Sequence, residues 1–198
     1  EATDADIVYF DFYKEYPTKS KAKRERDYAV DAQREYVRNM YNHRSYASVW
    51  NKCVRHSLYK EHKIYTPQYG YAEDCYLMSQ LVGYSSSIVH LDEYLYHYRK
   101  GNPNALTGQQ RRKRKREYAL NFLDLYERYK DVPTEENPVA VIFDDMLIQA
   151  GWYSIFYRLD LFKQYPWLAA AVRKAKMHRK TDVWLLSQLI TKIYSLFK

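Results

Sequence analysis

Residues 5–13 read Ala-Asp-Ile-Val-Tyr-Phe-Asp-Phe-Tyr, a run in which β-branched and aromatic residues predominate. Such residues are typical of a strand, so we expect one from Asp6 to Tyr13. The rest of the first half of the chain then has to supply the elements that pair with this strand and cover it.

Up to about Thr107 the chain alternates between helix-like and strand-like segments. Apolar spacing and breaker residues predict helices at 27–42 and 72–82, one or two strands at 87–99, and loops at 17–23 and 65–70. The segment 47–59 fits either a strand or a short helix. Together these segments predict a mixed α/β fold.

Gly101-Asn102-Pro103-Asn104 breaks this pattern, and the segments after it are expected to be helices. Apolar residues recur at helical spacing within residues 119–129, 139–157 and 186–197. We therefore expect two domains: a mixed α/β domain over residues 1–107, and a basic α-helical region over residues 108–198.

The composition is that of a globular protein, since 46% of the 198 residues are hydrophobic and only 5 are Gly and 6 are Pro. The sequence contains no long uncharged apolar run and no signal peptide after Glu1, so we expect neither a membrane span nor secretion. Cys53 and Cys75 fit reduced thiols better than a disulfide or zinc framework. These features predict a cytoplasmic protein.

The net charge of +8 is unevenly distributed. Six consecutive basic residues occupy 111–116, and residues 163–198 hold eight Lys or Arg against one acid, whereas the remainder is mildly acidic. A uniform nucleic-acid-binding domain does not have this distribution, so nucleic acid is not the expected partner. An anionic membrane surface, such as the inner face of a membrane, fits the basic patches better.

Glu73 and Asp74 form an acidic pair after a loop that contains Pro67 and Gly70. A carboxylate at a loop-to-helix junction can reach a cleft and act as a general base. Acidic residues are also common in the first turn of a helix, because they stabilise the helix dipole. The pair alone leaves both interpretations open.

Four segments follow one another in order: ADIVYFDFY at 5–13, WNK at 50–52, IYTPQYGYAED at 64–74 and YLYHYRKGNPNALT at 94–107. This ordered set resembles the second half of bacterial family 2 glycosyltransferases of the GT-A fold. The resemblance implies a partial GT-A-like sheet. It also implies a hexosyltransferase activity that moves a sugar, with inversion, from a nucleotide-sugar donor to a saccharide or lipid-linked saccharide acceptor.

By this resemblance Asp74 matches the catalytic base, which takes the proton from the acceptor hydroxyl, and Glu73 orients the acceptor or Asp74. Two adjacent carboxylates raise each other's pKa, which suits a base that works near neutral pH. Trp50 is expected to form an apolar wall under a sugar ring or, equally, to be a core residue. Lys52 is expected to contact the acceptor or to brace Asp74.

His97 and Arg99 fall on one face of the last predicted strand, and Tyr94, Tyr96 and Tyr98 fall on the other. An arginine can bind a phosphate through two parallel hydrogen bonds, so His97 and Arg99 are our candidates for contact with the donor pyrophosphate. The alternative is a surface histidine and a structural arginine.

The donor half of the family holds a divalent metal through an Asp-x-Asp motif. Asp4-Ala5-Asp6 has that spacing, but Asp6 matches the strand that comes after the true motif. We therefore expect no cofactor or metal site in this chain, and manganese or magnesium in the complete enzyme.

We also expect that the chain needs the missing N-terminal half or a partner chain for turnover. The exposed edge of a half sheet favours a homodimer.

A non-catalytic interaction module is the alternative function. In that case the half domain and its basic tail bind a partner or an anionic membrane surface, through Arg111–Arg116 and a C-terminal amphipathic helix that contains Trp184. The same helix could instead pack its apolar stripe on the other helices.

Overall fold

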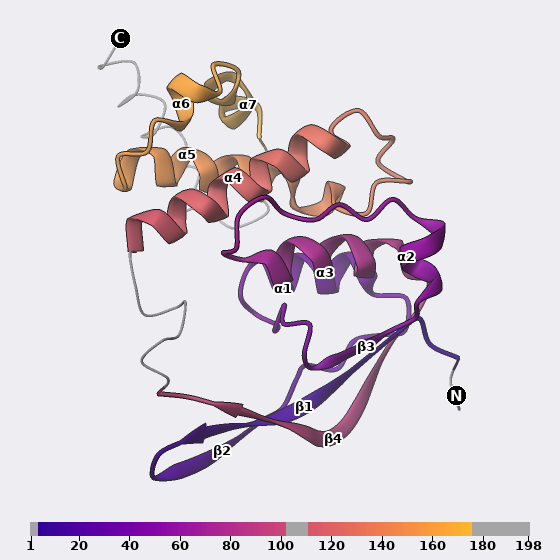
Figure 1. Cartoon of the computed structure of the whole chain (residues 1–198). Helices are drawn as coiled ribbons and strands as arrows, with labels where there is room; N and C mark the ends of the chain where they lie inside the picture. Colours follow the sequence, from indigo (N-terminus) through magenta and orange to yellow (C-terminus); the bar gives the residue numbers. More distant parts are fainter. Residues whose placement is uncertain (1–3, 102–110, 176–198) are drawn as a thin grey trace. The chain divides into compact units, whose positions relative to one another are not determined.

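The computed structural model describes residues 4–101 and 111–175 (Figure 1). These residues belong to two compact units. The described part of unit 1 consists of residues 4–67, 73–101 and 133–141, and that of unit 2 consists of residues 68–72, 111–132 and 142–175. Each helix within these ranges is too short or too polar to cross a bilayer.

Unit 1 is built on a mixed sheet centred on β1 (Ile7–Tyr16). β4 (Ile88–Arg99) runs parallel to β1 along one edge. Two antiparallel strands share the other edge: β3 (Lys52–Val54) pairs with the first residues of β1, and β2 (Lys19–Lys23) pairs with its last residues. The predicted first strand is confirmed, and the described residues have the expected mixed α/β character.

β2 shows that the predicted loop at 17–23 is wrong. Tyr16 and Lys19 face each other across a two-residue turn, and Lys19–Lys23 continues as a hairpin strand against β1. Most of β2 is exposed, so no apolar alternation marks it in the sequence. Its lysines are typical of an edge strand that resists further pairing.

Three helices accompany this sheet in unit 1. They are α1 (Gln33–Tyr41), α2 (Ser57–Glu61) and α3 (Glu73–Tyr84). The helix predicted at 72–82 is confirmed as α3. The ambiguous segment 47–59 contains both alternatives, because β3 is followed directly by α2.

α1 is shorter than the helix predicted at 27–42, because residues 27–32 are not helical. The Asp27 carboxylate meets His90 of β4, and the backbone N–H of Tyr28 donates to the Tyr9 hydroxyl at 3.0 Å. These tertiary contacts hold the segment in an irregular conformation that local propensity does not reveal.

The core of unit 1 joins β1 to α1 through aromatic rings. Tyr9 of β1 and Tyr36 of α1 are both fully buried, with ring centroids 5.0 Å apart. α1 also packs beside α3 (Figure 1). On α3, a Cβ at Gly83 would lie 2.1 Å from the carbonyl oxygen of Pro138. The close approach of the segment 133–141 to α3 therefore requires a glycine at position 83.

β4 pairs with β1 irregularly near its middle. The register shifts between Phe10 and Asp11 and again between Asp11 and Phe12. As a result Tyr94 and His97 both contact the ring of Tyr13, with centroids 4.9 and 5.0 Å away. The prediction that Tyr94 shares a face with the next two tyrosines of β4 is therefore wrong, because the bulge adds residues to one strand only.

Unit 2 is helical. It contains α4 (Arg111–Tyr129), α5 (Phe143–Phe156), α6 (Leu161–Gln164) and α7 (Leu168–Lys174), and a 3₁₀ turn, η2 (Ala140–Ile142), precedes α5. α5 packs against the other three helices (Figure 1). The apolar stripe predicted for α5 is buried, as Met146, Leu147 and Ala150 show. The helix predicted at 186–197, with Trp184 before it, lies outside the described residues.

Candidate functional site

The loop of residues 46–51, between α1 and β3, contains the candidate residue Trp50 and is held by the candidate residue Lys52. The ammonium of Lys52 donates three hydrogen bonds of 2.8 Å, to the backbone oxygens of Tyr46 and Ser48 and to Oδ1 of Asn51. These bonds close the loop on itself. They also use the three protons of the ammonium group within the protein.

Asp74, in the first turn of α3, is tied to the same loop. Its carboxylate accepts a hydrogen bond from the backbone N–H of Val49 and is attracted by the Lys52 ammonium. Burial raises the pKa of Asp74 above its ordinary value of 3.8, against the lowering effects of these two groups. Asp74 is therefore an oriented, half-buried carboxylate that accepts a proton more readily than a solvated aspartate.

Lys52 is a buried cation, with 8% of its surface exposed. Burial lowers its pKa to about 8, although the charges of Glu25 and Asp74 favour the protonated form. The lysine thus links two carboxylates from different parts of unit 1 to one loop.

Glu73 is exposed beside Asp74. Partial burial raises the pKa of Glu73, and the charge of Asp74 raises it further. The shift of Asp74, in contrast, comes from its burial. The mutual effect expected for adjacent carboxylates therefore acts mainly on Glu73.

Trp50 follows Val49 in the loop and is half-buried in an aromatic group. Its ring stacks on Tyr96 and Tyr98 of β4, with centroids 4.5 and 5.2 Å away, and meets Phe12 at an interplanar angle of 84°. Tyr96 is 38% exposed. Trp50 therefore belongs to a partly open aromatic surface.

His97 and Arg99 lie on β4 but on the face opposite Tyr96 and Tyr98. His97 pairs with Glu15 through Nδ1 at 2.6 Å, and both His97 and Arg99 are exposed. The hydrogen bond from His97 lowers the pKa of Glu15. The structure therefore brings Trp50, Lys52 and Asp74 to one loop and leaves His97 and Arg99 apart from it.

A buried polar network adjoins the loop through Asn51, and sequence reasoning missed it. Asn51 Nδ2 donates to Glu25 Oε1 at 2.8 Å, and the Glu25 backbone N–H donates to Asp11 Oδ1 at 2.7 Å. Asp11 has no exposed surface and Glu25 has 4%. Burial raises the pKa of Glu25, against the lowering effects of Lys52 and Asn51.

His90 of β4 completes this network. Its Nε2 lies 2.8 Å from Asp11 Oδ1, its Nδ1 meets the Asp27 carboxylate, and its ring stacks on Tyr9. His90 therefore connects Asp11 of β1 to Asp27. One signal could have revealed the network: a lone aspartate inside the apolar run YFDFY.

Within residues 4–101 and 111–175, no three His, Cys, Asp or Glu side chains are grouped so that they could hold a metal ion. Cys53 is exposed and Cys75 is buried, and neither forms a disulfide. Burial raises the pKa of the Cys75 thiol to about 12, so it is not a ready nucleophile.

Comparison of the chain with protein-family models, with curated proteins and with solved structures finds no match. The function therefore has to be inferred from the arrangement of the residues themselves.

Proposed function

We propose that the chain is the acceptor-side part of a family 2-like glycosyltransferase of the GT-A type, in which Asp74 is the catalytic base. The observation that supports this most is the link between Asp74 and the loop of residues 46–51. The Val49 N–H orients the carboxylate, Lys52 holds the loop, and burial raises the pKa of Asp74. These are the features that a general base requires.

In the proposed step, Asp74 removes the proton from an acceptor hydroxyl while that oxygen attacks the anomeric carbon of the donor sugar. The new glycosidic C–O bond forms as the bond to the nucleoside diphosphate breaks, and the bonding electrons leave with the diphosphate. The proton remains on Asp74 until water removes it. Glu73, exposed next to Asp74, would orient the acceptor.

Trp50 would supply the apolar wall for the acceptor sugar, because its aromatic group is partly open. Lys52 is better suited to bracing Asp74 than to binding an acceptor, since its ammonium protons already have partners. Contact of His97 and Arg99 with a donor phosphate remains a prediction, as does manganese or magnesium in the complete enzyme.

The test is sugar transfer by the protein as its genome encodes it, measured with radiolabelled nucleotide sugars. Asp74→Asn should lower the transfer rate by several orders of magnitude while the circular dichroism spectrum stays unchanged. Glu73→Gln, a neighbouring change of the same kind, should cost much less. Equal rates for Asp74→Asn and the unmodified protein would refute the proposal.

Binding to an anionic surface is the second candidate function. An open concavity in unit 2, with a volume of about 630 Å³, is lined by Arg111, Arg112, Lys113, Arg116 and Leu159. All four of these basic residues are exposed. Cations at a helix N-terminus are disfavoured by the helix dipole, so an anionic partner would relieve them.

Vesicle co-sedimentation tests this second function. Anionic phosphatidylserine vesicles should capture the chain and neutral phosphatidylcholine vesicles should not, and added salt should release it. Arg111→Gln with Arg116→Gln should weaken capture. Equal sedimentation with both kinds of vesicle would contradict an anionic-surface function.

A further inference from the structure

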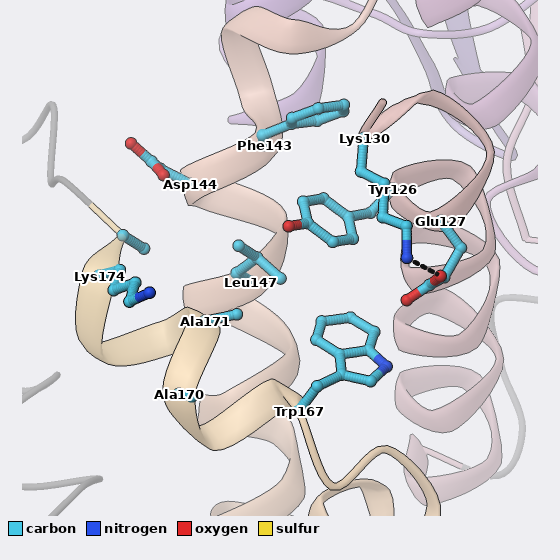
Figure 2. A pocket seen from close by; sticks show the side chains of 11 residues that line it. Tyr126, Glu127, Lys130, Phe143, Asp144, Leu147, Trp167, Ala170, Ala171 and Lys174 are labelled. Atoms are coloured by element: carbon cyan, nitrogen blue, oxygen red, sulfur yellow. Dashed lines mark hydrogen bonds and ion pairs between the residues drawn. The ribbon is translucent and has the colours of Figure 1, made fainter. Parts of the chain in front are cut away.

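A pocket of about 440 Å³ lies within unit 2, between α4, α5 and α7 (Figure 2). Its volume falls within the range of about 300–1,000 Å³ that is typical of small-molecule sites. Tyr126, Phe143 and Trp167 are among its lining residues, and each is half-buried. No part of the proposed transfer step uses this pocket.

The aromatic residues form one wall of the pocket. The rings of Tyr126 and Trp167 are nearly parallel, with centroids 5.4 Å apart and an interplanar angle of 25°. Phe143 meets Tyr126 edge-on at 5.0 Å. Because the three rings support one another, the wall is formed before any ligand binds, which reduces the entropic cost of binding.

Charged side chains border the aromatic wall in balanced numbers. Glu127 of α4 and Lys130, the residue that follows α4, form an ion pair of 2.8 Å, and Asp144 and Lys174 also line the pocket (Figure 2). Two acids and two lysines give no net attraction for an ion of either sign. They do supply both acceptors and donors of hydrogen bonds next to an apolar surface.

We infer that this pocket binds a pyranose residue of a neutral saccharide. A pyranose ring has an apolar C–H face, which can lie on the aromatic wall, and a rim of hydroxyl groups, which both donate and accept hydrogen bonds. A quaternary ammonium ligand would need a net negative pocket, and a phosphate would need a net positive one. This pocket has neither a net negative nor a net positive charge, whereas the basic concavity on α4 has a net positive charge.

This saccharide site is separate from the chemistry assigned to Asp74. It requires only the residues of unit 2 that line the pocket. The two proposals can therefore fail independently: loss of base function in Asp74→Asn should leave saccharide binding at this pocket unchanged.

The experiment is saturation-transfer NMR on the full chain with trisaccharides of glucose, galactose, mannose and N-acetylglucosamine, and with choline as another ligand class; binding of inorganic phosphate, which has no C–H protons, is followed by ³¹P line broadening. At least one trisaccharide should show saturation of its ring protons and compete with its own monosaccharide. Trp167→Ala should weaken that binding by about tenfold, as loss of one aromatic contact does. Glu127→Gln should weaken the binding severalfold, and it should not affect folding because the Glu127 side chain is partly exposed.

Trp152→Ala is the matched control, because Trp152 is also half-buried in unit 2 but packs on Phe156 and is not among the residues that line the pocket. It should leave the affinity unchanged. Absence of saturation transfer from every trisaccharide at millimolar concentration overturns the inference. So does binding that survives both Trp167→Ala and Glu127→Gln, or binding of choline or phosphate alone.

Discussion

The two units hold their candidate binding surfaces by different means. In unit 1, the loop next to Asp74 is held by hydrogen bonds from the Lys52 ammonium and by the hydrogen bond from Asn51 to the buried Glu25 carboxylate. In unit 2, the wall of the pocket is held by contacts between aromatic rings. A buried polar group that loses one partner is strongly destabilised, whereas packed rings lose stability gradually with lost contact. The position of Asp74 should therefore depend on a few specific partners.

The largest expected effect comes from breaking the network of unit 1 at His90. His90→Phe keeps a ring against Tyr9 but leaves the Asp11 carboxylate buried without its hydrogen-bond partner on β4. We expect the free energy of unfolding to fall by about 3–5 kcal/mol, measured by urea denaturation. His97→Phe, on the same strand but exposed, should cost less than about 0.5 kcal/mol. Similar losses for the two variants would show that the network is not structural.

The second effect is a pH dependence that arises from Lys52. Its pKa is about 8 when folded and 10.5 ordinarily, so between these values the unfolded chain binds a proton that the folded chain does not. Stability from this group therefore rises as pH increases from 8 toward 10.5, and falls as pH drops through 8. The unfolding free energy of the unmodified chain minus that of Lys52→Met should therefore rise over this range by up to about 3 kcal/mol. A difference that stays constant or shrinks would contradict this burial of the charge.

A third comparison uses one glycine from each unit. Gly83→Ala places a Cβ 2.1 Å from a backbone oxygen, so it should lower unit 1 stability by about 1–3 kcal/mol despite the better helix propensity of alanine. Gly151→Ala places its Cβ 3.2 Å from Val172 Cγ2, which can move slightly, so its net cost should be under about 1 kcal/mol. Thermal unfolding of the two variants checks the order, and the reverse order would contradict the tighter packing at Gly83.

The smallest effects should be stabilising. His43 follows α1 and Arg158 follows α5, each with a positive φ, of 57° and 48°. Glycine adopts this conformation without the strain that a Cβ causes. His43→Gly and Arg158→Gly should each raise the unfolding free energy by up to about 1 kcal/mol in chemical denaturation. A loss of stability would mean that these side chains contribute more than the strain costs.

The sequence predicted those elements whose apolar pattern is local. β1, α3, β4 and α5 have aromatic or apolar residues at strand or helix spacing, and they were predicted in the right places. β2 was missed because Lys-Ser-Lys-Ala-Lys has no buried face, so that only pairing with β1 makes it a strand. The bulge that moves Tyr94 to another face also depends on pairing between distant strands.

The candidate site was predictable only in part. The ordered segments pointed to Trp50, Lys52 and Asp74, and the structure ties them to one loop. The network around His90 was not predictable, because its contacts with Asp11 and Asp27 span 79 and 63 residues of sequence. Contacts at such separation leave no local pattern except a single aspartate in an apolar strand.

The role of Asp74 as a base is tested most directly by titration of its carboxyl group by ¹³C NMR in the full chain. The midpoint should lie above the ordinary value of 3.8, because burial outweighs the Val49 hydrogen bond and the Lys52 charge. The midpoint should be still higher in Lys52→Met, which removes the nearby positive charge. A midpoint at or below 3.8 would show that Asp74 is a solvated or structurally paired carboxylate, and the assignment of a poised base would be wrong.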